Sequence, residues 1–249
     1  MIKYLLFFFV TFIGFNAHGA KIHVKVGAGL RPPFMLQEGK GMGPEIINAF
    51  NLVQDEFHFE LVSVPIARRV MSLSEGWVDI VMWDNLEWGW GDDMHLLASN
   101  PLLQSQDSFI SHISARKDQR FFDSFHDKVI CGVNGYHYRF LNYQTDYKTI
   151  KEMFDIVLVR TEEESIKMAL NKRCDISVAS ASALDWFFVQ HPEERANILI
   201  SDKFDTQYTR SFLVPEYSPI SVQEINNILN KANALGLLAP IYKQYGQRF

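Results

Sequence analysis

The chain has 249 residues, 47% of them hydrophobic and 21% charged, so it is long enough for one large or two modest globular domains and lacks the composition of a disordered protein. Its formal net charge is −5 and its basic residues are scattered, which argues against nucleic acid as a partner. The two cysteines form no CxxC pair, so a cysteine metal site is not expected.

The first 19 residues have the parts of a cleavable secretory signal. Lys3 is followed by an apolar run over residues 4–15 and by small residues that end at Gly19. An uncleaved anchor is the alternative, but the run is shorter than the roughly 20 residues that a bilayer-spanning helix needs. No cysteine follows the run, so a lipoprotein is not expected. We therefore expect a signal peptide at residues 1–19 and an exported protein with a formal charge of −6, since Lys3 is lost.

Strands and helices alternate in the first part of the mature chain. The hydrophobic pattern predicts strands over residues 21–27, 57–64 and 79–83. A helix is expected to begin at residues 43–45, where a proline and an acid occupy the first turn, and another over 67–75. This order predicts a parallel sheet with right-handed crossovers.

One structural unit occurs twice along the chain. In residues 73–83 and again in 170–179, an amphipathic helix runs directly into a short apolar strand that begins with aspartate. Two such units predict two similar α/β lobes. The crevice between the sheet edges of two such lobes is the default place to bind a small ligand.

The second lobe is expected to repeat the layout of the first. The pattern predicts strands over residues 128–133, 156–159 and 175–179. Residues 161–164 have the sequence of a capping box and are expected to open a helix, and a further helix is expected over 183–190. The fold class is therefore α/β.

Two extended runs, residues 106–115 and 207–215, are unlike the short buried strands and are interpreted as connectors between the lobes. Two crossings make a hinge, and hinged lobes that close on a ligand are a known switching geometry. The end of the chain is expected to be helical, with apolar residues at helical spacing over 222–232 and a short last helix between Gly236 and Tyr245.

These connectors define the expected domains: lobe 1 comprises residues 20–110 plus 210–249, and lobe 2 comprises residues 111–209. Cys131 and Cys174 both fall in lobe 2, each beside a predicted strand. An oxidising compartment permits a disulfide between them, and two buried thiols are the alternative. The sequence leaves both open.

Six segments in this order and spacing resemble the periplasmic solute-binding proteins of ABC transporters, specifically the amino-acid-type family 3. The segments are VGAGLRPPF at 26–34, GMGPEII at 41–47, VDIV at 78–81, ASNPLL at 98–103, VICGVNG at 129–135 and LGLLAPIYKQYG at 235–246. The resemblance covers nearly the whole mature chain.

The resemblance implies a two-lobed periplasmic-binding-protein type II fold, in which each lobe is a mainly parallel sheet flanked by helices and two hinge strands join the lobes. It also implies a periplasmic monomer that closes around a small polar ligand in the cleft and presents it to a membrane permease or receptor. No cofactor and no metal are expected.

The sequence departs from the family pattern at both customary ligand anchors. Members that bind α-amino acids usually place an arginine just after the third strand, but residues 83–92 contain none. They also tend to place an acid after the second-lobe aspartate strand, where residues 178–181 read Val, Ala, Ser and Ala. We therefore expect a ligand that is not a standard α-amino acid.

Candidate ligand contacts are side chains at strand ends and in the aromatic loops, which offer a guanidinium, a carboxylate, hydroxyls and flat faces. Residues 135–139 are expected to open a helix whose N-terminal amides suit an anionic group. Packing of aromatics beneath the loops, and solvent exposure of the arginine and histidine, are the alternatives. The candidates are Arg31, Phe34, Trp83, Asp84, Trp88, Tyr136, His137, Tyr138 and Ser180.

Enzyme motifs are poorly represented. The chain has no HExxH and no GxSxG, and residues 27–32 only begin like a dinucleotide-binding loop. We therefore expect a binding protein and no catalytic residues. The alternatives are a periplasmic dehydratase or lyase on the same scaffold, with Asp84, Glu87 or His137 in acid–base roles, and a sensory protein that signals to a membrane receptor.

Overall fold

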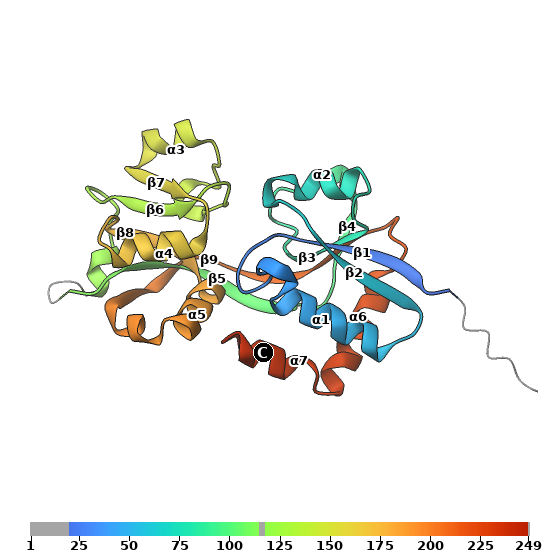
Figure 1. Cartoon of the computed structure of the whole chain (residues 1–249). Helices are drawn as coiled ribbons and strands as arrows, with labels where there is room; N and C mark the ends of the chain where they lie inside the picture. Colours follow the sequence, from blue (N-terminus) through green and yellow to red (C-terminus); the bar gives the residue numbers. More distant parts are fainter. Residues whose placement is uncertain (1–19, 115–117, 249) are drawn as a thin grey trace, which may run out of the picture.

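The computed structural model describes residues 20–114 and 118–248, which form two α/β lobes side by side (Figure 1). The expected signal peptide lies outside the described residues. One path of hydrogen-bonded strands runs through both lobes in the order β2-β1-β3-β9-β5-β8-β6-β7, with β4 beside β9. None of the helices in the described part of the chain is both long and apolar enough to cross a membrane.

The bounds of the elements follow the sequence-based expectation for most of the chain. The strands are β1 (Ile22–Ala28), β2 (Phe57–Ser63), β3 (Ile80–Asp84), β4 (Leu96–Ala98), β5 (Leu103–His112), β6 (Ile130–Val133), β7 (Ile156–Val159), β8 (Ile176–Ser180) and β9 (Ile198–Pro215). The α-helices are α1 (Met42–Val53), α2 (Arg69–Ser74), α3 (Tyr147–Met153), α4 (Glu162–Leu170), α5 (Ala181–Gln190), α6 (Val222–Ala234) and α7 (Leu238–Gln244).

Each lobe is built around three parallel strands with β1 or β6 in the middle. β1 pairs with β2 and β3 in lobe 1, and β6 pairs with β7 and β8 in lobe 2. In lobe 1, Val24 and Val26 of β1 are fully buried and belong to one apolar cluster with Phe50 of α1 and Ile225 of α6. The expectation of two similar parallel lobes is therefore confirmed.

The aspartate that begins each repeated unit has the same structural role in both lobes. The Asp79 carboxylate accepts a hydrogen bond from the Lys25 amide at 2.7 Å, and the Asp175 carboxylate accepts one from the Val129 amide at 3.0 Å. Each aspartate therefore joins the start of the third strand to a backbone amide of the central strand, in the middle of β1 and directly before β6, that would otherwise lack a partner. The need for a carboxylate that accepts from this amide explains why an aspartate precedes both apolar strands.

Two details of lobe 2 differ from expectation. Helix α3 was not anticipated, because its seven residues bury only Ile150 and carry no amphipathic repeat; Asp146 caps it by accepting from the Thr149 amide. At α4, Thr161 is the N-cap as expected, but the carboxylate of Glu164 accepts from the amide of Arg160, so the reciprocal half of a capping box is displaced by one residue.

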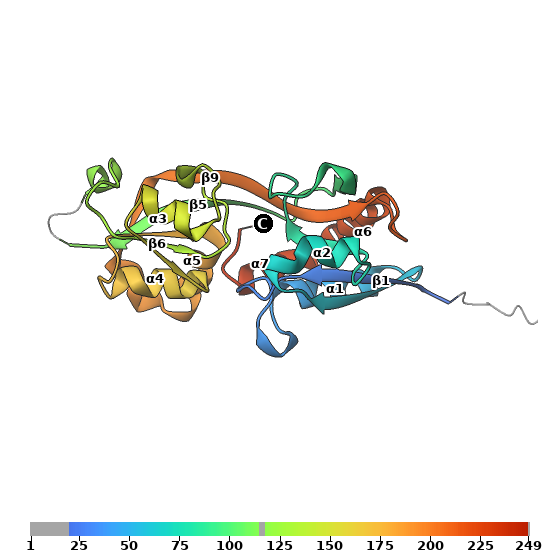
Figure 2. The same cartoon turned by 90° about the horizontal axis from the view of Figure 1, so that it is seen from above.

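The hinge is a two-stranded antiparallel ribbon of β5 and β9 that runs from one lobe to the other (Figure 2). The ribbon extends from the pair Leu103 and Arg210 to the pair His112 and Ile198. β9 therefore begins nine residues before the predicted connector at 207, because it also serves as an edge strand of lobe 2. The register shifts next to Asp107, which places a bulge in the middle of the ribbon.

The last described residues form a further contact between the lobes. Gln247 donates a hydrogen bond to the carbonyl of Ser182 at 3.1 Å, and the ring of Tyr245 lies 5.2 Å from that of Trp186 in α5. The hydroxyl of Tyr245 donates to Glu45 of α1 at 2.7 Å, which holds this segment on lobe 1. In both views the end of the chain lies between the lobes (Figures 1 and 2).

Cys131 and Cys174 form a disulfide, with their Cα atoms 5.9 Å apart. Cys131 is in β6, and Cys174 precedes β8. Both are buried. Of the two alternatives that the sequence left open, the structure has the disulfide.

Replacing both cysteines with alanine is expected to lower the free energy of unfolding by about 3 kcal/mol, because the bond closes a long loop and restricts the unfolded chain. The two residues are 43 positions apart. Urea unfolding of the two proteins with and without reductant measures the difference. Reductant should destabilise the natural protein and leave the double variant unchanged; equal stabilities of both proteins under oxidising conditions would contradict this role.

Candidate functional site

A cavity of about 70 Å³ lies between the lobes, over the hinge ribbon. Its walls are the carboxyl-terminal ends of β1 and β3, the start of α2, the loop after β6, and the middle of β5 and β9. This is where a two-lobed parallel architecture places its ligand crevice. The side chains of arginine, aspartate and histidine that line it are Arg31, Arg69, Asp84, Asp107, His137 and Arg210.

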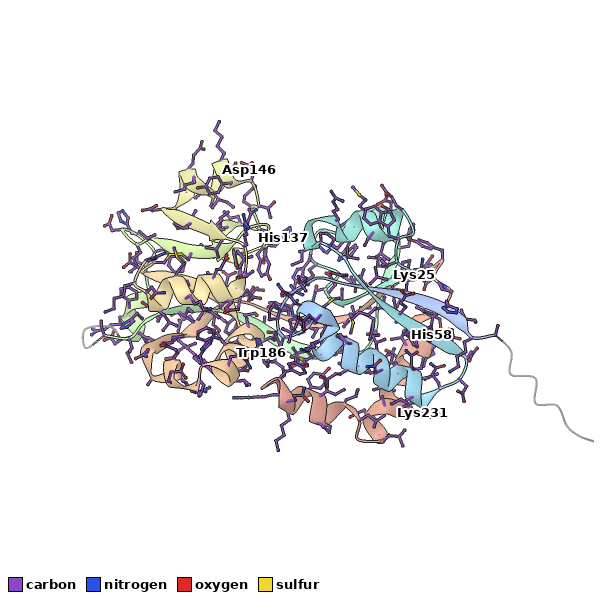
Figure 3. The ribbon with its side chains drawn as sticks, in the orientation of Figure 1. Lys25, His58, His137, Asp146, Trp186 and Lys231 are labelled. Atoms are coloured by element: carbon purple, nitrogen blue, oxygen red, sulfur yellow. A yellow bond between two sulfur atoms is a disulfide. The ribbon has the colours of Figure 1, made fainter. Side chains whose placement is uncertain are left out.

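Five of the nine candidate residues line this cavity. Arg31, Asp84 and Trp88 come from lobe 1. Tyr136 and His137 come from lobe 2. Figure 3 shows His137 on lobe 2 at the edge that faces lobe 1. The structure therefore brings together side chains that are about 50 to 100 positions apart in the sequence.

Phe34 and Trp83 lie beneath the cavity rather than on its surface. They are 1% and 2% exposed, and their ring centroids are 4.7 Å apart. The Phe34 ring faces the guanidinium groups of Arg31 at 5.3 Å and of Arg210 at 4.9 Å. These two aromatics therefore form an apolar floor under two cations.

Tyr138 and Ser180 are buried in lobe 2 and do not line the cavity. The Tyr138 hydroxyl accepts a hydrogen bond from the Val133 amide at 2.9 Å. Ser180 caps α5 by accepting from the Ala183 amide at 3.2 Å. Both side chains hold lobe 2 together in this structure.

The helix expected to open at residues 135–139 is absent. The chain instead makes a turn and one 3-10 turn, Arg139–Leu141. The amides of Arg139 and Phe140 donate to the Asp205 carboxylate at 2.6 and 2.8 Å. Because a protein carboxylate already occupies these amides, the prediction of an anion site at a helix N-terminus here is wrong.

Trp83 has an unusual backbone that shapes the cavity. Its φ is 65°, and the β3–β9 register shifts between Val81 and Asp84. A bulky residue rarely adopts this left-handed conformation, which stores strain and is typical of functional sites. The Trp83 carbonyl accepts from Arg31 at 3.2 Å and from Arg210 at 3.1 Å. The bulge therefore positions both guanidinium groups.

Arg210 of β9 is a buried cation that the sequence analysis missed. It is 1% exposed, and its guanidinium lies within 5 Å of the ring centroids of Phe34, Trp88 and Tyr208. It donates to the Trp83 carbonyl and to the Tyr208 hydroxyl, and its Nε has no hydrogen-bond partner. Among the described residues, no carboxylate hydrogen-bonds to it, so its charge is available to a ligand.

Arg69 is the second missed cation. Its Nε lies 3.3 Å from a carboxylate oxygen of Asp84, and its guanidinium also donates to the carbonyl of Trp88. The side chains of Arg69 and Asp84 are 18% and 12% exposed, so this is a largely buried ion pair. Arg69 begins α2, and an arginine at the start of a short helix otherwise reads as a solvated residue.

Asp107 of β5 completes the floor of the cavity, at the hinge bulge. It accepts a hydrogen bond from the Tyr208 hydroxyl at 2.7 Å. Burial, together with the charge of Glu162, raises the pKa of Asp107 to about 7. Burial and the charge of Arg69 lower the pKa of His137. Near neutral pH Asp107 is therefore only partly ionised, in a cavity that three arginines line.

The carboxylates around the cavity already have donors. Asp84 accepts from the Asn85 amide and the Trp90 indole. Glu162 accepts from the Ser180 amide and the Tyr136 hydroxyl. Within the described part of the chain, the buried side-chain polar atoms without a hydrogen-bond partner are all donors: Arg31 Nε, Arg69 Nε, Arg210 Nε and Trp83 Nε1. Arg69 Nε faces the Asp84 carboxylate and Trp83 Nε1 lies beneath the cavity. The donors left for a ligand are those of Arg31 and Arg210, and they suit a group rich in acceptors and negative charge.

Solved structures with the same fold are ligand-binding proteins. The glutamate complex of the GluR0 ligand-binding core from Nostoc punctiforme is 16% identical, with a TM-score of 0.70, over 90% of this chain and 100% of that chain. The ancestral amino acid-binding protein AncCDT-1, described as a precursor of cyclohexadienyl dehydratase, is 16% identical, with a TM-score of 0.67, over 90% and 96%. The arginine-, lysine-, histidine-binding protein ArtJ from Geobacillus stearothermophilus is 16% identical, with a TM-score of 0.64, over 91% and 95%.

These likenesses show that the chain has the two-lobed type II periplasmic-binding-protein fold, as the sequence motifs indicated. No protein-family profile and no curated protein sequence matches the chain. At this identity the comparison defines the architecture, and the ligand has to be argued from the residues of the cavity.

Proposed function

We propose that this protein is an exported solute-binding protein that closes its two lobes around a small anionic solute and presents it to an ABC permease. The observation that carries the proposal is the set of three guanidinium groups in the inter-lobe cavity, of which Arg210 is buried without a carboxylate partner. A planar guanidinium binds a carboxylate or a similar anion through two parallel hydrogen bonds. Burial strengthens that interaction.

Contacts across the cleft support closure around the solute. The Arg31 guanidinium of lobe 1 interacts with the Tyr136 hydroxyl of lobe 2, and Tyr136 donates to Glu162 at 3.3 Å. This chain of polar groups joins the lobes directly beside the cavity. A bound anion adds to the charge interactions that hold the lobes together in the closed form. The closed form therefore binds the anion more tightly than the open form, and closure requires this difference in affinity.

The proposed ligand is not a standard α-amino acid. Such a ligand needs acceptors for its ammonium group as well as donors for its carboxylate. The carboxylates of Asp84 and Glu162 are already hydrogen-bonded to protein donors, and Asp107, with a pKa raised to about 7 by burial, is partly protonated at neutral pH. Residues 83–92 contain no arginine, but Arg69 and Arg210 supply guanidinium groups from other elements.

A thermal-shift screen tests this proposal. A carboxylate without an ammonium group, present at 100 times its dissociation constant, is expected to stabilise the protein by about 2.7 kcal/mol and to raise the melting temperature by roughly 5–10 °C. The 20 standard amino acids and the alcohols that match each carboxylate are the controls and should give no shift. A clear shift with a standard amino acid, or none with any organic anion, would contradict the proposal.

An acid–base enzyme on the same scaffold is the second candidate, favoured by one observation. Asp107 lies in the cavity with a pKa raised to about 7 by burial and by Glu162, which is the range that suits a general base at neutral pH. Incubating the protein with each compound that binds, and following the compound by NMR, separates the two functions. Release of the compound unchanged supports binding, and turnover supports the enzyme.

A further inference from the structure

A second cavity of about 300 Å³ lies next to the first in the gap between the lobes. Arg31, Ile66 and Tyr136 line both cavities. The two spaces are therefore neighbouring compartments of one cleft, and the Arg31–Tyr136 contact stands between them. Figure 3 shows His137, which lines the first cavity, well apart from Trp186, which lines the second.

The sizes of the two compartments differ in a way that constrains the ligand. A water molecule in the liquid occupies about 30 Å³, and ligand pockets in proteins measure about 300–1,000 Å³. The first cavity, at about 70 Å³, has room only for a head group such as a carboxylate. The second, at about 300 Å³, reaches the size of a ligand pocket. A ligand whose charged group occupies the first cavity must extend into the second.

The walls of the second cavity are mainly apolar and come from both lobes. Leu30 and Leu36 belong to lobe 1. Ala183, Trp186 and Phe187 come from α5 of lobe 2. Trp186 is half-buried and is held by its ring contact with Tyr245, so its indole presents a fixed flat face. Such a surface favours an aromatic ring or an alkyl chain over a second charged group.

Polar residues occur mainly at the rim of this compartment. Arg160 and Glu163 are exposed, and His191 is 39% exposed. Glu162 is 6% exposed, but its carboxylate is bonded to the Ser180 amide and to Tyr136. Apart from Arg31, which lines both cavities, the described residues of this compartment include no buried cation with an unpaired donor, whereas Arg69 and Arg210 also line the first cavity.

We infer that the ligand is an amphipathic carboxylate whose anionic head is bound by the arginines of the first cavity and whose aromatic or alkyl tail lies between Leu30 and Trp186 in the second. This inference rests on the proposed function, because the proposed function supplies the anionic head group of the ligand. The Arg31–Tyr136 pair lies beside the ligand where head and tail join. Closure of the lobes buries the tail between the two apolar walls.

The test compares a head alone with the same head carrying a tail. Calorimetric titrations with acetate, hexanoate and 3-phenylpropionate are expected to show at least tenfold tighter binding of the two tailed acids. Acetate binding as tightly as hexanoate would overturn the tail compartment and leave the proposed function intact. No binding of any of the three acids would also overturn the inference, while the proposed function would be overturned only if no organic anion in the thermal-shift screen binds.

Two pairs of variants locate the tail. Leu30 is 51% exposed, so Leu30→Asn can be made without disturbing the core; it should weaken hexanoate and 3-phenylpropionate binding at least threefold and leave acetate unchanged. Leu52→Asn is its control, since Leu52 is 80% exposed on α1 and lines neither cavity.

Trp186→Ala should weaken binding of the tailed acids at least tenfold, and Trp77→Ala, at a 39% exposed tryptophan that lines neither cavity, should have no effect. Unchanged affinity for the tailed acids in both Leu30→Asn and Trp186→Ala would overturn the inference.

Discussion

Replacing Arg210 with methionine is expected to weaken binding of an anionic ligand about 1,000-fold, or about 4 kcal/mol, because removing one partner of a buried charge pair leaves the other charge unpaired. Arg210 is 1% exposed, and its guanidinium lies within 5 Å of the centroids of three aromatic rings. Methionine is long and flexible enough to fill the space between these rings, so the fold should persist.

Two further variants make the experiment specific. Arg210→Lys keeps the charge but not the planar fork, and should retain part of the affinity. Arg120→Met removes an exposed guanidinium on lobe 2 that pairs with Asp118, and should leave the affinity unchanged. Calorimetric titration measures the affinities, and urea unfolding confirms that each variant is folded. An Arg210→Met protein that binds within tenfold of the natural protein would remove Arg210 from the site.

Replacing Asp107 with asparagine is expected to raise the free energy of unfolding by about 4 kcal/mol more at pH 8 than at pH 4. This figure follows from the difference between the pKa values of Asp107 in the folded and unfolded protein. Burial, with the charge of Glu162, raises the pKa of Asp107 from 3.8 to about 7. Between these two values the native state keeps a proton that the unfolded chain has lost. The natural protein therefore loses stability as the pH rises from about 4 to about 7, and the variant does not.

Urea unfolding of both proteins from pH 4 to pH 8 gives the free energy of unfolding of each as a function of pH. The effect is the difference between the two curves, in which the contributions of the other titrating groups cancel. Asp118→Asn is the matched control. Hydrogen bonds from Arg120 lower the pKa of the exposed Asp118 carboxyl, so any contribution of Asp118 has the opposite sign and is lost as the pH falls. Parallel stability curves for the natural protein and Asp107→Asn would show that burial does not raise the pKa of Asp107 above its value in the unfolded chain.

Much of the fold follows from local patterns that the sequence displays openly. The parallel strands are short apolar runs, and Asp79 and Asp175 mark the start of the third strand in each lobe because the neighbouring backbone amide needs their carboxylates. Arg31, Asp84 and Trp88 could be placed in the cleft because residues at the carboxyl ends of parallel strands gather at one edge.

The rest of the site depends on contacts that no local pattern contains. Arg210 is a charged residue between Thr209 and Ser211 and so reads as a solvent-facing residue of a connector. Its burial arises from contacts with Phe34, Trp83 and Trp88, which are distant in the sequence. Asp107 reads as a polar residue of a connector, and its burial arises only when β9 pairs with β5. Residues 135–139 do not open the expected helix, and the amides of Arg139 and Phe140 donate to Asp205, 66 and 65 positions away in the sequence.

The attachment of the last described residues to α5 sets how far the lobes can separate. Tyr245 and Gln247 join the end of lobe 1 to Trp186 and Ser182, in addition to the hinge ribbon. A small parting of the lobes leaves both contacts in place, whereas a wide one must break a hydrogen bond and a ring contact, at a cost of about 1–3 kcal/mol. The end of the described chain thus limits the opening of the lobes through four residues, one of which, Ser182, is also hydrogen-bonded to Ser105 of the hinge ribbon at 3.1 Å.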